Sequence, residues 1–362
     1  MRTPRLFAAA LTVALGCSVS ASSSSSPPSD LDPAAGKPVE TAEPAEKPLE
    51  PAKPDPQAEA KKQAQERLAK LDAENKAEAA RWTPGLTAAT TKLAATNWRS
   101  LSQATKAVLA SEHRKPGNAA RDSFRHPLET LKFFGLATNM NVFEVGPGAG
   151  WWTEILAVVL ANKGTLAVAT REPNPEDPSA YYAKRTTSML ATAPAVFGKV
   201  ERVPNSGSDS FEMGAPGSRD MILFMRAAHG LAEDGKLAAF LAAAHTTLKP
   251  GGVLAIEQHR APDGADPVKS APMGYLPQAW LIEQVEAAGF KLAAKSELNA
   301  NPKDTKDYAK GVWALPPSLA EGDTDRAKYE AIGESDRMTL KFVKAKQRAT
   351  PKAATDTMKT AK

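Results

Sequence analysis

Short apolar runs alternate with longer amphipathic segments over most of the second half of the chain. The runs are predicted as buried strands, because they are short, rich in Val, Ile, Leu and Phe, and bounded by Gly and Pro. The segments between them carry apolar residues at helical spacing. Strands that alternate with helices indicate a mainly parallel sheet with both faces covered. The expected strands are 142–145, 165–170, 195–203, 220–225, 252–258, 291–297 and 338–344.

The predicted fold class is α/β, a Rossmann-like, doubly wound and mainly parallel sheet of seven strands. The last two strands are joined without a crossover helix of ordinary length, so we expect them to form an antiparallel hairpin at the sheet edge. The expected helices are 101–111, 118–136, 151–161, 179–193, 233–248 and 277–288. We place the folded domain at residues 98–344, with a helical extension before it.

The part of the chain before residue 98 is too poor in large apolar residues to build a core. Residues 22–57 are dominated by Ser, Pro, Ala, Glu and Lys, so a disordered linker is expected. Residues 58–82 contain neither Gly nor Pro and are rich in Ala, Lys, Glu and Leu, which predicts a helix. Because its apolar residues are mostly Ala, we expect this helix to be a solvated stalk or to dock loosely.

Residues 1–21 are typical of a bacterial export signal. Arg2 and Arg5 precede an apolar run that is too short to span a bilayer as a mature helix. Cys17 follows Ala, Leu and Gly, which resembles a lipoprotein box whose cysteine becomes lipidated, although Ala stands where Leu is usual. A competing cut lies after Ala21, and an uncleaved helix is the remaining alternative. We expect an exported chain, either periplasmic or anchored to the membrane through Cys17.

Positive charge is concentrated at the end of the chain. The net charge is +5, and residues 341–362 contain seven basic residues and one acidic residue, so the remaining residues sum to about −1. A basic patch on the folded part is not indicated, and a nucleic-acid-binding protein is not expected. We interpret residues 345–362 as a basic disordered tail, with contact to anionic lipid or cell wall as the alternative. The single cysteine excludes a disulfide framework and a cysteine-rich metal site.

A glycine-rich turn follows the first predicted strand, where residues 142–150 read VFEVGPGAG. Gly146, Gly148 and Gly150 let the backbone adopt positive φ and approach a ligand closely. The N-terminus of the next helix presents free N–H groups behind them. Glu144, near the end of the strand, is expected to face the same crevice. The turn therefore predicts a cofactor site, with a turn that binds no ligand as the alternative.

The spacing of these glycines separates two classes of ligand. Dinucleotide-binding turns need G-x-G-x-x-G, so the third glycine here stands one position early for a pyrophosphate. The pattern E-x-G-x-G-x-G instead resembles that of class I S-adenosylmethionine-dependent methyltransferases. This resemblance implies that the glycines approach the amino-acid end of the cofactor and that Glu144 interacts with its ammonium group. The stretch LKPGGVLA at 248–255 resembles the turn before the fifth strand in the same superfamily.

Two further acidic residues are candidates for binding the nucleoside part of S-adenosylmethionine. In the superfamily an acidic residue at the end of the second strand holds the ribose hydroxyls, and Glu172 lies two positions beyond that strand. Asp209 precedes the fourth strand and is a candidate for contact with the adenine. The expected cofactor-binding residues are Glu144, Gly146, Gly148, Gly150, Glu172 and Asp209.

Six stretches between about residues 119 and 344 form a longer pattern. They are RHPLETLKFFG (125–135), VGPGAGWWTEIL (145–156), FMRAAHG (224–230), GGVLAIEQHR (251–260), NANPKDTKDYAKGVWALPP (299–317) and IGESDRMTLKFVK (332–344). This pattern resembles a family of bacterial predicted methyltransferases, often exported, whose substrate is not established. The resemblance implies a fold and a cofactor, and it leaves the acceptor open.

Chemistry in an open α/β sheet is expected beyond the carboxyl ends of the strands. Arg226 and His229 follow the fourth strand, and His259 and Arg260 follow the fifth. Methyl transfer requires that the acceptor be oriented and, where needed, deprotonated, and a neutral histidine suits the second task near pH 7. We take His259 as the first candidate base, His229 as the second, and Arg226 as a further catalytic candidate. Each histidine has a local structural hydrogen bond as its alternative role, and no compact spacing predicts a metal site.

Three functions are considered for this sequence. The first is an exported methyltransferase that acts on a small-molecule or cell-envelope acceptor, and the second is a non-catalytic binding protein that keeps the fold. The third, a nicotinamide-dependent oxidoreductase, is disfavoured by the glycine spacing. The long segment between the last two strands, which contains Asp304, Glu334 and Asp336, is expected to cover the acceptor pocket, with polar loop capping as the alternative.

Overall fold

The computed structural model describes residues 56–170, 180–205 and 211–345. The expected export signal, linker and basic tail lie outside these ranges, and so do Glu172 and Asp209. Among the helices within them, none combines the length and the apolar character needed to cross a bilayer.

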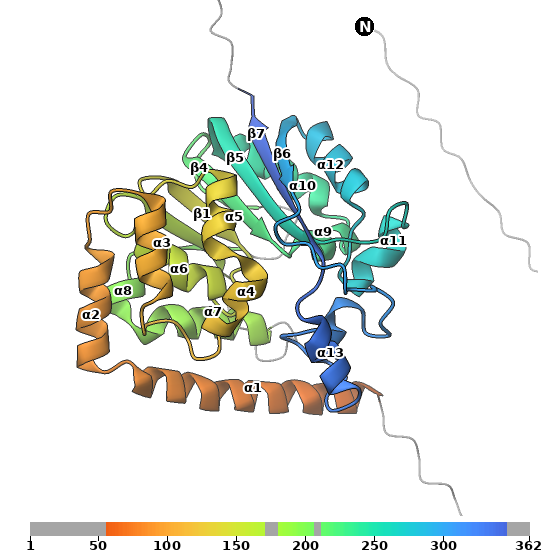
Figure 1. The fold of residues 1–362 in the computed structure, drawn as a ribbon, viewed down its shortest axis with the longest axis horizontal. Helices are drawn as coiled ribbons and strands as arrows, with labels where there is room; N and C mark the ends of the chain where they lie inside the picture. Colours follow the sequence, from red (N-terminus) through yellow and green to blue (C-terminus); the bar gives the residue numbers. More distant parts are fainter. Residues whose placement is uncertain (1–55, 171–179, 206–210, 346–362) are drawn as a thin grey trace, which may run out of the picture. The chain divides into compact units, whose positions relative to one another are not determined.

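Seven strands form one sheet through the centre of the fold (Figure 1). They are β1 (Asn141–Val145), β2 (Thr165–Thr170), β3 (Glu201–Pro204), β4 (Arg219–Met225), β5 (Leu248–His259), β6 (Phe290–Ser296) and β7 (Arg337–Lys344). Their spatial order is β3-β2-β1-β4-β5-β7-β6. The pairs from β3 to β5 are parallel, whereas β7 runs antiparallel to both β5 and β6. The predicted α/β, Rossmann-like sheet with an antiparallel hairpin is confirmed.

Helices cover both faces of this sheet. One face carries α2 (Pro84–Ala94), α3 (Leu101–Leu109), α5 (Pro127–Phe134), α6 (Trp151–Leu160), α7 (Ala180–Thr192) and α8 (Pro194–Phe197). The other face carries α9 (Ala228–Glu233), α10 (Leu237–Thr247) and α12 (Gln278–Ala287). The remaining helical pieces are α1 (Pro56–Arg81), η1 (Ala119–Arg121), α4 (Asp122–Arg125), α11 (Pro267–Ser270), η2 (Ala271–Met273), η3 (Gly311–Ala314) and α13 (Arg326–Ile332).

The central strands are apolar on both faces because each face packs against helices. In β4, Met221, Leu223 and Met225 belong to one core cluster, while Ile222 and Phe224 belong to the other. Strand β6 lies at the edge of the sheet, and its residues alternate between more exposed and more buried positions. The sequence pattern of each strand therefore follows its place in the sheet.

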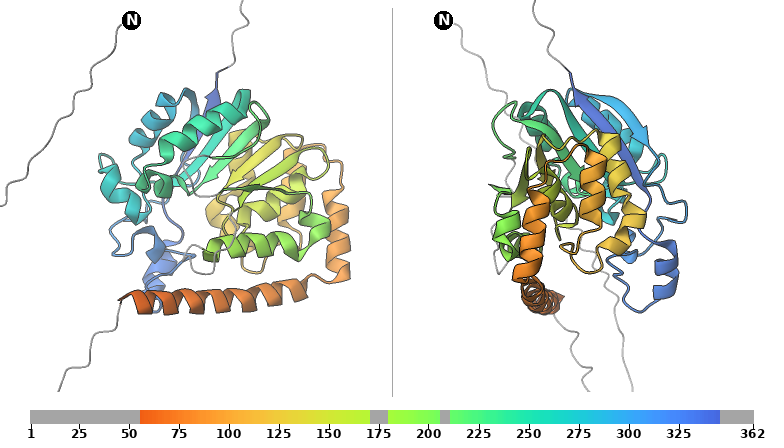
Figure 2. Two further views of the ribbon diagram at one scale, coloured as in Figure 1. Left: turned by 180° about the vertical axis from the view of Figure 1, so that it is seen from behind. Right: turned by 60° about the vertical axis from the view of Figure 1, so that its left-hand side comes forward.

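Helix α1 lies along α7 (Figure 2). Leu71 is only 1% exposed. Asp72 pairs with Lys184 at 2.7 Å, and the guanidinium carbon of Arg67 is 4.6 Å from the ring centroid of Tyr181. The helix expected as a stalk is thus docked through one large apolar side chain and several polar contacts.

The strand expected at 195–203 is wrong in its first part. Pro194 opens the short helix α8, and Gly198 ends it by donating its N–H to the Pro194 oxygen at 2.8 Å. Val196 and Phe197 are apolar because they pack into the helical layer of the core. Strand β3 is consequently short and lies at the end of this stretch.

The helix expected at 233–248 is interrupted. Gly235 has a φ of +69° between α9 and α10, which ends the first helix before the second begins. The fifth strand also starts earlier than residue 252, because Leu248 already pairs with Arg219 of β4. The pairing register shifts next to this pair, and Gly251 has a φ of +81°.

Candidate functional site

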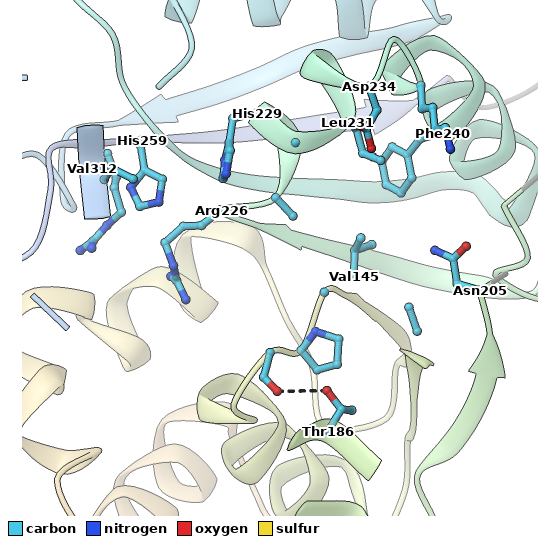
Figure 3. Close-up of a pocket in the computed structure, with 18 of the residues that line it drawn as sticks. Val145, Thr186, Asn205, Arg226, His229, Leu231, Asp234, Phe240, His259 and Val312 are labelled. Atoms are coloured by element: carbon cyan, nitrogen blue, oxygen red, sulfur yellow. Dashed lines mark hydrogen bonds between the residues drawn. The ribbon is translucent and has the colours of Figure 1, made fainter. Parts of the chain in front are cut away.

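A cavity of about 740 Å³ opens beyond the carboxyl ends of β1, β2, β4 and β5. This volume is typical of sites for small molecules. The cavity is lined by the turn after β1, the ends of β2 and β3, parts of α7 and α9, and the segment between β6 and β7. Figure 3 shows its two ends, which we name the Asn205 end (Asn205, Leu231, Asp234, Phe240) and the histidine end (Arg226, His229, His259).

The predicted glycine turn forms part of the cavity wall. Gly146, Gly148 and Gly150 have φ values of +62°, +57° and +79°, a region that a Cβ atom disfavours. Gly146 and Gly148 line the cavity, and the nearest atom to a Cβ built on Gly148 would be the Gly146 oxygen at 3.9 Å. Gly150 instead begins α6 and packs on Met189. Thr186 Oγ1 donates a hydrogen bond to the Gly148 oxygen at 3.0 Å (Figure 3) and holds the turn in place.

Glu144 lies just before this turn and is buried. Its side chain is 2% exposed and is not part of the cavity lining. Thr153 Oγ1 of α6 donates a hydrogen bond to Glu144 Oε2 at 2.7 Å. Burial raises the pKa of Glu144 to about 7, against the opposing effects of this hydrogen bond and of the charge on Arg226. The structure therefore gives Glu144 a protein partner, and its role in cofactor binding stays a prediction.

Several lining residues at the Asn205 end were not predicted. Asn205 follows β3 directly, and its N–H donates to the Thr170 oxygen at 2.6 Å, which ties the ends of β3 and β2 together. Phe211 and Phe240 meet edge to face, with ring centroids 5.5 Å apart, and supply an apolar wall. A polar residue within two positions of the end of a predicted strand is the signal that identifies Asn205, since strand ends of this kind reach the crevice.

His229 and His259 come from α9 and the end of β5 and lie side by side at the histidine end. Their ring centroids are 5.9 Å apart. Gln258 Nε2 lies 3.2 Å from His229 Nδ1, and Ser335 Oγ lies 2.6 Å from His259 Nδ1. The ring of Trp313 contacts His229 at a centroid distance of 5.8 Å. The structure thus brings together the two histidines that the sequence singled out.

The orientation of Gln258 fixes the tautomer of His229. Gln258 Oε1 accepts a hydrogen bond from the Ala228 N–H at 3.2 Å, and Gln258 Nε2 donates to the Gly274 oxygen at 2.9 Å. Since the amide nitrogen can only donate, His229 Nδ1 must accept, and the neutral ring carries its proton on Nε2. His259 Nδ1 shares a hydrogen bond with the Ser335 hydroxyl, and when the ring donates in this bond its Nε2 carries the lone pair.

Both histidines are neutral near pH 7. Burial lowers the pKa of His229. Burial, followed by the neighbouring His229, Arg226 and Arg337, holds the pKa of His259 well below the ordinary histidine value. A neutral pair with these tautomers offers a bound molecule one proton acceptor and one hydrogen-bond donor.

Arg226 joins the same end of the cavity with a strained backbone. Its φ is +55°, which costs a residue with a side chain about 1–2 kcal/mol. The conformation is held by Glu257, whose backbone oxygen accepts from the Arg226 N–H at 2.6 Å and whose Oε1 accepts from Nη1 at 3.1 Å. Strain of this kind is concentrated at functional sites.

The segment between β6 and β7, which was expected to cover the acceptor pocket, contributes a buried wall of the cavity. Glu334 and Ser335 of this segment and Arg337, the first residue of β7, line the cavity and are at most 3% exposed. Asn301 Nδ2 donates to the Glu334 oxygen at 2.6 Å, and the Asp336 N–H donates to an oxygen of Asp304 at 2.8 Å. Across the ranges given above, no three His, Cys, Asp or Glu side chains are grouped so that they could hold a metal ion.

No model of a known protein family matches the chain, and no curated protein matches it. Solved structures are similar at a low level. A SAM-dependent methyltransferase from Aquifex aeolicus is 16% identical over 67% of this chain and 97% of that chain, with a TM-score of 0.40. The 4+2 cyclase SpnF is 17% identical over 61% and 81%, with a TM-score of 0.43. An S-adenosylmethionine dependent methyltransferase from Mesorhizobium loti is 12% identical over 57% and 91%, with a TM-score of 0.36.

Proposed function

We propose that the chain is an S-adenosylmethionine-dependent methyltransferase that acts on a small-molecule or cell-envelope acceptor. One observation carries the proposal: Gly146 and Gly148, both in a left-handed backbone conformation, open onto the same cavity as the neutral His259. The glycine spacing resembles that of class I methyltransferases, and among the described residues no side-chain atom lies within 4 Å of a Cβ built on Gly148. One wall of the cavity is therefore suited to a cofactor and another to the chemistry of a second molecule.

The residues of the cavity fit an adenosyl group. Phe211 and Phe240 offer an apolar surface, and Asn205 and Asp234 offer polar groups beside it. Small-molecule sites combine these two features, with few polar groups fixing the orientation of the ligand. The backbone of the glycine turn would hold the amino-acid end of the cofactor, as the resemblance implies.

The histidine end fits the role of acceptor site. When bound, S-adenosylmethionine supplies a methyl group on a sulfonium centre. His259 Nε2 would take the proton of the acceptor, because its Nδ1 is occupied by Ser335. His229 Nε2 would donate a hydrogen bond that positions the acceptor, because its Nδ1 is occupied by Gln258.

Calorimetric titration of the full chain tests this function. We expect S-adenosylmethionine and S-adenosylhomocysteine to bind, and NADH, the control cofactor, to give no heat. Binding of neither adenosyl compound would overturn the proposal and favour the non-catalytic binding protein. Mass spectrometry of the purified protein for a retained nucleoside provides a second readout that needs no added ligand.

We further propose that the protein is exported, on the basis of the charged and apolar pattern of residues 1–21 and of Cys17. Expression in a bacterial host followed by mass analysis of the mature N-terminus tests this. A lipidated Cys17 supports membrane anchoring, and a cut after Ala21 supports a free periplasmic protein. An intact Met1 in the cytoplasmic fraction would overturn the proposal of export.

A further inference from the structure

Three arginines surround one carboxylate behind the histidine end of the cavity. Arg121, Arg125 and Arg337 form ion pairs with Glu334 at 2.9, 2.9 and 2.6 Å. Burial would raise the pKa of Glu334, but the surrounding guanidinium groups outweigh burial and hold this pKa well below the ordinary value. Glu334 is therefore a fully charged carboxylate shared among several cations.

A fourth arginine and a second carboxylate extend this group. Glu257 is fully buried and lies 3.1 Å from Arg226 Nη1 and 2.8 Å from Arg337 Nε. The positive charge of Arg226 also contributes to lowering the pKa of Glu334. We name the four residues the arginine cluster, which consists of Arg121, Arg125, Arg226 and Arg337.

The arginine cluster has more positive than negative charge. Its four guanidinium groups face only two carboxylates, those of Glu334 and Glu257. The adjacent His229 and His259 are neutral, and Glu144, with a pKa of about 7, adds at most one negative charge. Asp336, the next acid along the chain, is bound by Arg260 and Lys306, each at 2.8 Å. A net positive charge therefore remains at this end of the cavity.

Two members of the cluster have nitrogen atoms available to a ligand. Arg125 is 3% exposed and lines the cavity, yet among the described residues only its Nε has a hydrogen-bond acceptor. Arg226 also lines the cavity, and within the same ranges only its Nη1 has a side-chain acceptor. Figure 3 shows the Arg226 side chain extending below His229 and His259 into the cavity. Guanidinium donors that have no protein acceptor and face a cavity are suited to binding an anion.

We propose that Arg125 and Arg226 bind a carboxylate or phosphate group of the methyl acceptor. This inference rests on the proposed function and narrows it to an anionic acceptor. Guanidinium groups bind both anions through charge-assisted hydrogen bonds. Trp313 is 36% exposed at the cavity beside His229 and offers a flat apolar surface to the rest of the molecule. The acceptor is thus a small anion with an apolar or planar body, bound next to His259.

A carboxylate in this cavity has two possible sources, because S-adenosylmethionine carries one of its own. We assign the bound anion to the acceptor because Arg226 lies on the same wall as His229 and His259, where the acceptor is deprotonated. The two sources are separated by comparing S-adenosylhomocysteine with 5′-methylthioadenosine, which lacks the amino-acid end.

The experiment is calorimetry on the full chain at constant ionic strength, with inorganic phosphate, benzoate and the neutral benzamide as probes. Wild type is compared with Arg226→Gln and with Arg326→Gln, a matched change at an exposed arginine of α13 that pairs only with Glu330 among the described residues. We expect phosphate and benzoate to bind the wild type better than benzamide. Arg226→Gln should weaken both anions by about tenfold or more, as for a lost charge-assisted hydrogen bond, while Arg326→Gln should not.

Each other outcome contradicts a defined part of the proposal. If benzoate and benzamide bind the wild type alike, or if neither anion binds, there is no anion site, even where S-adenosylhomocysteine binds normally. If Arg226→Gln weakens S-adenosylhomocysteine but not 5′-methylthioadenosine, the anion belongs to the cofactor and the assignment to the acceptor is wrong. If the anions bind through Arg226 but no adenosyl compound binds, the proposed function fails and the anion site stands. The comparison of benzoate with benzamide on wild type holds whether or not the variant folds.

Discussion

His229 and His259 face one cavity with ring centroids 5.9 Å apart, yet their Nδ1 atoms are held by different kinds of partner. An amide donor from Gln258 meets His229, and a hydroxyl from Ser335 meets His259. His229 is thereby fixed as a hydrogen-bond donor through Nε2, and His259 is a proton acceptor in the tautomer whose Nδ1 donates to Ser335. The following predictions depend on this asymmetry and on the glycine turn opposite it.

Replacing the two histidines should have unequal effects on methyl transfer. His259→Asn removes the lone pair that accepts the proton, so we expect kcat to fall by about 100-fold or more. His229→Gln places an amide donor near the position of the imidazole Nε2, so its loss should be much smaller. Steady-state kinetics with the acceptor, once it is identified, and S-adenosylhomocysteine binding as a control for folding would measure both. Equal losses in the two variants would contradict the assignment of His259 as the base.

The rate should remain constant as pH falls through the range where an ordinary histidine titrates. Because burial and nearby cations hold the pKa of His259 well below the ordinary value, its neutral form persists at pH values below about 6.5. We expect the decline of kcat on acidification to begin well below pH 6.5. A pH–rate profile at saturating substrate measures this, and an inflection at or above pH 6.5 that His259→Asn abolishes would show the prediction to be wrong.

Glu144→Gln should stabilise the fold at pH 8 and change it little at pH 4.5. The pKa of Glu144 is raised from 4.5 to about 7, so the folded state keeps a proton that the unfolded chain releases as pH rises through this interval. The free energy of unfolding of the wild type is therefore unaffected by this group below pH 4.5. It decreases as pH rises from 4.5 to 7, by at most about 3 kcal/mol. The glutamine oxygen can still accept the hydrogen bond from Thr153.

Urea unfolding of wild type and Glu144→Gln at several pH values measures this difference, with the exposed Glu129→Gln as the matched control. A difference between wild type and Glu144→Gln that stays constant with pH would rule out the proton uptake. The same variant tests whether Glu144 serves the cofactor, because a loss of S-adenosylhomocysteine affinity without a loss of stability would show a binding role.

Gly148→Ala should weaken cofactor binding far more than a matched change elsewhere. Gly148 and Gly264 have φ values of +57° and +73°, so an alanine at either position costs about 1–2 kcal/mol of stability. Only Gly148 lines the cavity, where the added methyl group would occupy ligand space. We expect S-adenosylhomocysteine affinity to fall for Gly148→Ala and to be unchanged for Gly264→Ala. Similar affinities in both variants would exclude the glycine turn from the binding site.

The sequence predicted the features that depend on local patterns. The glycine turn can be predicted because glycine is the residue that adopts positive φ readily, so Gly146 and Gly148 indicate this conformation without knowledge of their neighbours in space. The central strand β4 can be predicted because a strand that is buried on both faces appears in the sequence as an uninterrupted apolar run. Helix α2 was missed because Leu86 and Leu93 are its only large apolar residues, and the folded part therefore begins before the expected residue 98.

The interactions that shape the histidine end were not predictable in this way. The pair of Arg125 with Glu334 joins residues 209 positions apart, and nothing near either residue indicates its partner. The contact of His229 with Gln258 depends on how α9 meets the end of β5. The sequence named both histidines, but which of them accepts a proton follows from partners that only the folded chain brings together.

The place of β7 between β5 and β6 has a consequence for folding. Strand β6 cannot join the sheet before β7 does, because β7, the last strand of the sheet along the chain, is the strand that joins β6 to the rest. Glu334 and Ser335 directly precede β7, and Arg337 begins it. A chain interrupted just before them would retain the glycine turn while lacking the wall that receives the acceptor, so the acceptor end of the cavity is completed only when β7 joins the sheet.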